Sequence, residues 1–252
     1  MPILKPLLQA SVLVAFLFAG TGAFAQSSNE ASGLTKEQVE TIVRDYLREN
    51  PEVVIEAIEA YRAKQQLAEE QMREQALAAK RDQIFEDPMA PTNGVTDADV
   101  TLVEFFDYQC GYCKKVFPDI MAVMEDDKKL RVVFKELPIL GPESVIAARA
   151  GMAAHKQGKY MAYHQAVMDL RGKLSEKRIM QAAAEAGLDM ERLAKDMESP
   201  EIDDYLRANL QLAQEIGVNG TPAMFIGNQF IPGAIDRKAL VHLIDQERKA
   251  GG

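Results

Sequence analysis

Cysteine is scarce in this 252-residue sequence, where it occurs only twice, as Cys110 and Cys113. An exported protein that relies on structural disulfides usually carries several widely spaced cysteines. A pair this close in the chain cannot connect distant loops. We therefore expect the two thiols to be present for their chemistry.

Histidine is scarce as well. A zinc site takes four protein ligands, or three and a water, and an isolated CxxC motif supplies two. The other soft ligands are three histidines, none spaced three or four positions from another: His155, His164 and His242. The sequence therefore predicts no metal ligands. Half of a zinc site and an inert surface disulfide are the alternative interpretations of the motif.

Basic residues are outnumbered by acidic ones, 29 to 38, and the formal net charge is −9. A chain this acidic is a poor candidate for binding nucleic acid, because the phosphate backbone attracts basic surfaces. We therefore expect no nucleic-acid partner.

The N-terminus lacks acidic residues and has a short apolar run at residues 11–20, preceded by Lys5. Small residues occupy the −3 and −1 positions of a cleavage site after Ala25, as in a secretory signal peptide. The run is shorter than the roughly 20 residues of a membrane span. We therefore predict a signal peptide over residues 1–25, cleaved after Ala25, with an uncleaved anchor as the alternative.

Two helical patterns follow. Thr35 and Gln38 fit a capping box, and Asn50-Pro51 is typical of the start of a second helix. The apolar residues recur at helical spacing and form one face: Val39, Ile42, Val43, Tyr46, Leu47, Val54, Ile58 and Tyr61. This face needs to be buried, so we predict an oligomerisation segment over residues 34–61. Packing back onto the rest of the chain is the alternative.

Residues 62–90 keep a helix-forming composition with few apolar positions, which predicts a helical or flexible linker. Asp87-Pro88 and the turn-forming residues 91–94 then break the helix and mark a domain boundary. From residue 91 to 252 strands and helices alternate. The expected order is β-α-β, a helical insertion at about 142–217, then β-β-α, which is an α/β fold.

The CxxC motif follows the apolar run 100–106 directly and opens a helix. At a helix N-terminus, free N–H groups and the helix dipole favour an anion, so the pKa of Cys110 should fall. Cys113 lies one turn further on, close enough for a disulfide with Cys110. We expect Cys110 to attack a substrate disulfide and Cys113 to resolve the mixed disulfide. Gly111 and Tyr112 between them are uncharged and act through backbone and packing.

Glu104 lies inside the apolar run, six residues before Cys110. A carboxyl group in a strand covered on both faces should have a raised pKa and could exchange protons with Cys113. The alternatives are a glutamate that reaches solvent, or one paired with Lys135 on the neighbouring strand.

Thr221-Pro222 precedes the apolar strand 223–226. A proline can open a strand only where its missing N–H is not needed. A cis bond here would turn the preceding backbone toward the CxxC motif, where it could pair with an extended substrate peptide. Taken alone, Gly-Thr-Pro is an ordinary turn.

Three features together resemble the DsbA-like branch of thioredoxin-fold proteins: residues 104–114 (EFFDYQCGYCK), the helical block, and residues 220–223 (GTPA). The resemblance runs from about Val100 to the C-terminus. It implies a thioredoxin fold in which Cys110 attacks, Cys113 resolves, and Glu104 is the buried acid. It also implies that the Thr221-Pro222 loop, with Gly111 and Tyr112, binds substrate.

The chain departs from the oxidase DsbA, which has Pro-His between its cysteines and Val before the cis-proline. Gly-Tyr with Thr-Pro resembles disulfide isomerases of the DsbC kind, and residues 36–79 resemble the stalk of ScsC-type proteins, some of which trimerise. The resemblance thus implies a periplasmic isomerase or reductase of misfolded disulfide proteins. It would use no cofactor beyond the Cys110–Cys113 disulfide, exchange electrons with a membrane thiol donor or acceptor, and form a homo-oligomer, favouring a trimer.

Two other functions are possible on the same residues. The first is a dithiol oxidase of the DsbA type. The second is a copper(I)-handling protein, because the two thiolates of a CxxC motif suit Cu(I).

Overall fold

The computed structural model describes residues 33–251, so the predicted signal peptide lies outside the described residues. The chain divides into two compact units, the first ending at Ala60 and the second beginning at Tyr61. None of the helices within residues 33–251 is long and apolar enough to cross a membrane.

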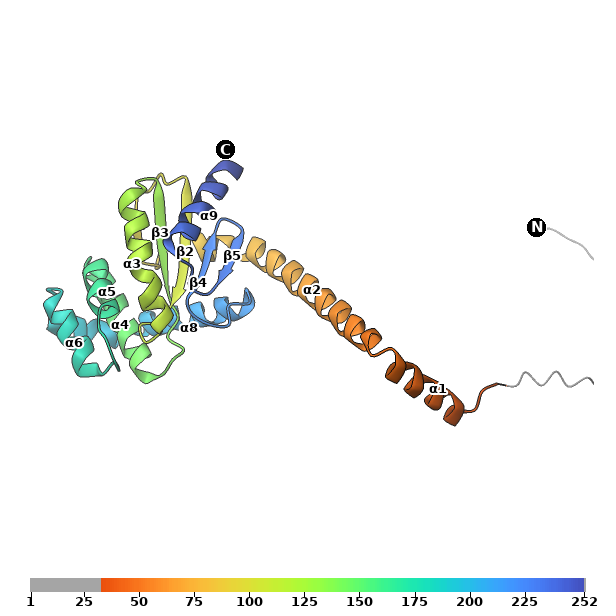
Figure 1. Ribbon diagram of the computed structural model, residues 1–252. Coiled ribbons are helices and arrows are strands. Elements are labelled where there is room, and N and C mark those ends of the chain that lie inside the picture. Colours follow the sequence, from red (N-terminus) through yellow and green to blue (C-terminus); the bar gives the residue numbers. More distant parts are fainter. Residues whose placement is uncertain (1–32, 252) are drawn as a thin grey trace, which may run out of the picture. The chain divides into compact units, whose positions relative to one another are not determined.

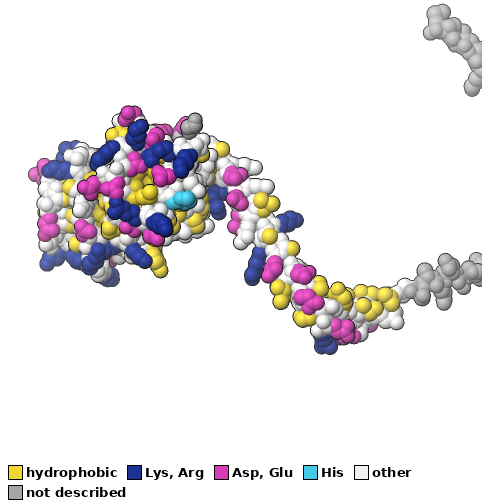
Figure 2. Space-filling view, turned by 45° about the horizontal axis from the view of Figure 1, so that its top comes forward, with side chains coloured by type: hydrophobic (Ala, Val, Ile, Leu, Met, Phe, Trp, Pro, Cys, Tyr) yellow, Lys and Arg dark blue, Asp and Glu magenta, His cyan; other side chains and the backbone are white. Residues whose placement is uncertain are grey.

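The first unit contains α1 (Lys36–Glu49) and the start of α2 (Glu52–Phe85). The predicted capping box is confirmed: Gln38 N–H donates to the Thr35 hydroxyl, and Thr35 N–H donates to the Gln38 side chain. Nothing in α1 is buried. Seven apolar side chains of this unit are 43–58% exposed: Val39, Ile42, Val43, Tyr46, Val54, Ile55 and Ile58. Figure 2 shows such side chains in yellow along the N-terminal helices.

The second unit is built on a five-stranded sheet with the order β1-β3-β2-β4-β5 (Figure 1). The two central strands, β2 (Val100–Phe106) and β3 (Leu130–Glu136), are parallel. The other strands are antiparallel to their neighbours: β1 (Thr92–Gly94) pairs with β3, β4 (Ala223–Ile226) with β2, and β5 (Gln229–Pro232) with β4. This is the mixed sheet of the thioredoxin fold that the sequence predicts.

Seven helices follow β2 along the described part of the chain. They are α3 (Gly111–Asp126), α4 (Pro142–Lys156), α5 (Tyr160–Met168), α6 (Glu176–Glu185), α7 (Met190–Met197), α8 (Pro200–Glu215) and α9 (Arg237–Ala250). Side-chain caps at Ser175, Asp189 and Asp236 begin α6, α7 and α9. The predicted helical insertion is therefore α4 to α8, between β3 and β4.

Both faces of the sheet are covered, as the continuous apolar sequence of β2 indicates. Leu102 and Phe106 of β2 pack with α3, the helical insertion and α9. The alternate residues, Val103 and Phe105, face the other way and pack with the end of α2 and with α8. Successive side chains of a strand point to opposite faces, so each face receives its own hydrophobic core.

Two elements differ from the expectation. The predicted break is present, since α2 ends at Phe85, but residues 92–94 within it also form the short edge strand β1 (Thr92–Gly94) against β3. Residues 62–90 were expected to connect two domains, yet Leu77, Ile84 and Phe85 of α2 are buried in the core on the second face of the sheet. The end of α2 is therefore part of the catalytic unit.

Candidate active site

Cys110 is the N-cap residue of α3, immediately after the loop that leaves β2. Its sulfur accepts a hydrogen bond from the N–H of Cys113 (3.4 Å), and when it is protonated its thiol donates to the carbonyl of Thr221 (3.1 Å). The neighbouring Cys113 side chain is the largest cause that lowers the pKa of Cys110 from 9.0 to about 6. The Thr221 side chain and the backbone N–H groups of Cys113 and Tyr112 lower the pKa further, against the effect of burial.

Cys113 is fully buried beneath Cys110. Burial is the largest cause that raises the pKa of its thiol, and the neighbouring Cys110 and Glu104 raise it further. The two cysteines therefore differ as attacking and resolving thiols must. At neutral pH Cys110 holds the thiolate and Cys113 holds its proton.

Glu104 lies in the middle of β2, between Phe134 of β3 and Met224 of β4. Its side chain is fully buried, and neither carboxyl oxygen has a hydrogen-bond partner among the described residues. Burial, and then the charge of Cys110, raise the pKa of Glu104 from 4.5 to about 8.

Neither structural alternative for Glu104 is found. It does not reach solvent, and Lys135 is engaged elsewhere. The Lys135 ammonium donates to the Asp87 carboxylate (2.5 Å) and to the Gln83 carbonyl (2.7 Å). Glu104 is therefore a buried carboxylic acid close to the two cysteines, protonated at neutral pH.

The Thr221–Pro222 peptide bond is cis, and the Thr221 carbonyl meets the Cys110 thiol as described above. The sequence prediction that this loop faces the CxxC motif is thus met by the geometry. Pro222 precedes β4, and its carbonyl accepts a hydrogen bond from the N–H of Gly233 (2.9 Å). A groove of about 480 Å³ runs beside this loop.

Gly111 and Tyr112 occupy the first turn of α3. Tyr112 is 67% exposed, and a methyl group added to Gly111 would meet no atom within 4 Å. The rim of the site around Cys110 is therefore open to a large substrate.

Asp107 is a further residue of the site that the sequence analysis did not single out. Its buried carboxylate accepts hydrogen bonds from four donors: the N–H groups of Gln109 (2.7 Å), Ile139 (2.8 Å) and Leu140 (2.9 Å), and the hydroxyl of Ser144 (2.7 Å). These bonds join the turn before Cys110 to the loop after β3. Asp107 is a positioning residue, and an acid directly after a buried strand was the only signal for it.

His164 belongs to a buried polar network on the same side of the sheet. Tyr108 and Tyr160 donate hydroxyl hydrogen bonds to Glu136 (3.2 and 3.0 Å), and His164 Nδ1 lies 3.0 Å from the Tyr108 hydroxyl. Burial lowers the pKa of His164 to about 3, and its ring stacks on Tyr160. The histidine is thus accounted for as a neutral core residue. Residues 33–251 contain no cluster of three His, Cys, Asp or Glu side chains that could hold a metal ion.

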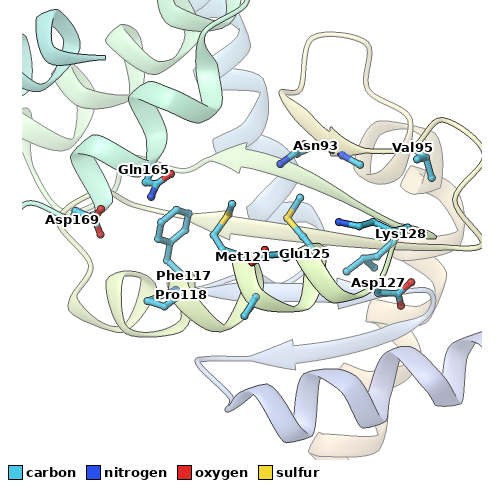
Figure 3. A pocket seen from close by; sticks show the side chains of 14 residues that line it. Asn93, Val95, Phe117, Pro118, Met121, Glu125, Asp127, Lys128, Gln165 and Asp169 are labelled. Carbon is cyan, nitrogen blue, oxygen red and sulfur yellow. Dashed lines mark hydrogen bonds between the residues drawn. The ribbon is translucent and has the colours of Figure 1, made fainter. Parts of the chain in front are cut away.

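A separate groove of about 710 Å³ runs along α3 (Figure 3). Phe117 and Met121 of α3 line it, together with Asn93 of β1 and Gln165 of α5. Its lining includes neither cysteine and no residue of the Thr221–Pro222 loop. The groove beside the cis-proline is lined by neither cysteine, but it is lined by Thr221, whose carbonyl contacts the Cys110 thiol.

Comparisons with known families agree with this geometry. The family described as DSBA-like thioredoxin domain matches residues 101–245. The family described as Copper resistance protein ScsC N-terminal domain matches residues 36–68.

Among solved structures, a thioredoxin-like oxidoreductase from Silicibacter pomeroyi is 43% identical, with 67% of this chain and 98% of that one covered and a TM-score of 0.65. A linker-deletion mutant of Proteus mirabilis ScsC is 30% identical, with 88% and 100% covered and a TM-score of 0.68. A periplasmic thioredoxin-like protein from Salmonella enterica serovar Typhimurium is 31% identical, with 67% and 95% covered and a TM-score of 0.61.

Curated relatives include the Na(+)/H(+) antiporter NhaA of Herminiimonas arsenicoxydans, 32% identical over 173 residues, or 66% of this chain. The match spans only 27% of the antiporter's length. The similarity is therefore to one part of that longer protein.

Proposed function

The chain belongs to the DSBA-like thioredoxin domain family and is a thiol–disulfide oxidoreductase, and from this premise we propose that it is an exported disulfide isomerase or reductase of misfolded proteins. The observation that carries the proposal is the asymmetry of the CxxC pair. Cys110 has a pKa of about 6, whereas burial raises the pKa of Cys113. A thiolate with a pKa near ambient pH combines a high ionised fraction with good nucleophilicity.

The reaction begins when the Cys110 thiolate attacks one sulfur of a substrate disulfide. A Cys110–substrate disulfide forms, and the other substrate sulfur leaves as a thiolate. In isomerisation, a different substrate thiolate attacks the mixed disulfide and releases Cys110 unchanged. In reduction, Cys113 attacks Cys110, so that the Cys110–Cys113 disulfide forms and the substrate leaves with both sulfurs reduced. A membrane thiol donor then returns two electrons to the pair.

Glu104 serves the resolving step in this proposal. Cys113 must lose a proton before it can attack, yet burial strongly disfavours its thiolate. Glu104 is protonated while Cys110 is a thiolate, because that charge adds to the effect of burial on the pKa of Glu104. In the mixed disulfide Cys110 carries no charge, so Glu104 can release its proton to solvent, and the resulting carboxylate can accept the proton of Cys113. Substrate is held at the open rim by Gly111, Tyr112, Thr221 and Pro222.

Isomerisation also requires that a misfolded chain be retained through several attacks. Several active sites on one oligomer raise the effective concentration of thiols around a bound substrate. We assign oligomer formation, as a trimer, to residues 34–61, whose apolar side chains are exposed in the single chain. The predicted export to the periplasm provides disulfide-bonded substrates.

A dithiol oxidase is the second candidate, and a specific observation favours it. The hydrogen bonds that lower the pKa of Cys110 stabilise the reduced, thiolate form, and a stabilised reduced form makes a disulfide more oxidising. The direction of net electron flow therefore depends on the reduction potential of the pair.

Two assays on one preparation test the proposal. The reduction potential is measured by equilibration with glutathione, and the refolding of scrambled ribonuclease is compared with the oxidation of reduced ribonuclease. An isomerase restores activity to scrambled ribonuclease catalytically. A protein that oxidises reduced ribonuclease but leaves the scrambled form inactive is an oxidase, and the isomerase proposal is then wrong.

A further inference from the structure

The groove beside the cis-proline loop receives one charged side chain from outside that loop. Its lining comprises the loop residues, Phe230 and Pro232 of β5, and Arg73 of α2. Arg73 is the only ionisable residue in the lining. A positive charge from α2 thus lies in the groove that shares Thr221 with the contact to Cys110.

Arg73 is held in position but not neutralised. Its guanidinium lies over the ring of Phe230, 4.6 Å from the centroid, and that ring is packed against Phe225 of β4. Within residues 33–251 the structure records no ion pair for Arg73, and its Nε is buried without a hydrogen-bond partner. By contrast, Lys80 and Arg81 on the same helix bind Glu215 and Asn228.

Arg73 is half-buried, and of its guanidinium donors Nε is the one that is buried without a partner. That donor has already lost its water, so a ligand that supplies an acceptor to this guanidinium is favoured. The planar fork of arginine matches a carboxylate in two parallel hydrogen bonds. The groove begins at Thr221, whose carbonyl contacts the Cys110 thiol. A peptide that is joined to Cys110 and extends past Thr221 would therefore bring the side chains near its cysteine to this groove.

We propose that Arg73 binds an aspartate or glutamate of the protein substrate, within about three residues of the attacked cysteine, and so selects acidic segments. The inference rests on the thiol-exchange function proposed above, and Arg73 acts as a specificity-determining residue. The net charge of −9 would by itself repel acidic peptides. A preference for them therefore requires a local cation such as Arg73.

The test uses the oxidised full-length protein and three reduced peptides that differ only in having Glu, Gln or Lys near a single cysteine. One peptide thiolate opens the Cys110–Cys113 disulfide, and a second copy of the peptide attacks the mixed disulfide, so that two peptide thiols form one disulfide-linked dimer for each protein disulfide reduced. The rate of dimer formation is measured at neutral pH by acid quench and mass spectrometry. Each rate is divided by the rate at which the same peptide reacts with a small-molecule disulfide. This ratio removes differences in the intrinsic reactivity of the three peptide thiols. The expected order is Glu, then Gln, then Lys, with about a tenfold advantage of Glu over Gln.

Arg73→Gln should abolish most of that advantage, and Arg73→Lys should keep part of it. Arg81→Gln is the matched control, since it removes the same charge from the same helix outside the groove, and it should keep the full preference. Equal Glu and Gln rates in the wild-type protein overturn the inference even if Arg73→Gln does not fold. A preference that survives in a folded Arg73→Gln protein overturns it as well. If none of the peptides is oxidised, the thiol-exchange function itself fails and the inference fails with it.

Discussion

Glu104 makes the stability of the reduced protein depend on pH in a direction opposite to that of most carboxylates. Its pKa is 4.5 in an unperturbed chain and about 8 when buried in the fold. Between these values the unfolded chain loses the proton while the folded protein keeps it, so stability is present at low pH and falls as pH rises through this window. Each pH unit costs about 1.4 kcal/mol. From pH 4.5 to pH 7, this one group therefore lowers the free energy of unfolding by about 3 kcal/mol.

Glu104→Gln removes this dependence. Between pH 4.5 and pH 7, the free energy of unfolding of Glu104→Gln should rise by about 3 kcal/mol relative to that of the wild-type protein. Urea unfolding of both proteins under reducing conditions, at half-unit pH steps, measures it. Because the other titrating groups are the same in both proteins, their contributions cancel in the difference. Glu125→Gln, on the exposed side of α3, serves as the matched control. Parallel curves for wild type and Glu104→Gln would show that Glu104 ionises normally and would refute its role as proton acceptor.

Three further results are expected at the active site and the N-terminal segment. Alkylation of the reduced protein should modify Cys110 with a midpoint near pH 6 while sparing Cys113; equal labelling of both in peptide maps contradicts the assigned roles. Thr221→Val should slow the refolding of scrambled ribonuclease and speed the oxidation of reduced ribonuclease. If both activities are unchanged, Thr221 does not set the balance between isomerisation and oxidation. A chain that begins at Tyr61 should be monomeric by light scattering and lose isomerase activity, whereas a full-length protein that is already monomeric refutes assembly through residues 34–61.

The central strands and the helical insertion could be predicted because their signals are local. Continuous apolar runs mark β2 and β3 as buried on both faces, and prolines, glycines and capping residues mark the helix ends. The insertion predicted at about 142–217 agrees with α4 to α8, which begin at Pro142 and end at Glu215.

The elements that the sequence did not reveal depend on distant partners. β1 is three polar or glycine residues long, and it is a strand only because the edge of β3 is open to pair with it. Three of the four donors to Asp107 lie more than thirty residues further along the chain. Arg73 appears in the sequence as an ordinary solvated residue of a polar helix, and only the fold places it beside the cis-proline loop.

The extent of α2 also determines which truncation can test the oligomer. The side chains of β2 are apolar on both faces of the sheet. The face that carries Val103 and Phe105 must therefore be covered by other elements, and α8 covers only part of it. Leu77, Ile84 and Phe85 supply the rest, with exposures of 8%, 0% and 6%. Burial of each such side chain is worth about 1.5–3 kcal/mol, so their loss removes roughly 5 kcal/mol or more, comparable to the whole stability of many domains.

A chain that begins at Glu86 should therefore unfold at much lower urea concentration than one that begins at Tyr61, and it should bind hydrophobic dyes through the uncovered face. The chain that begins at Tyr61 keeps all three side chains and should unfold with the same midpoint as the sheet of the full-length protein. Equal midpoints for the two truncated chains would show that the end of α2 is not part of the core. Only with the Tyr61 start can a loss of isomerase activity be assigned to loss of the oligomer rather than to a damaged catalytic unit.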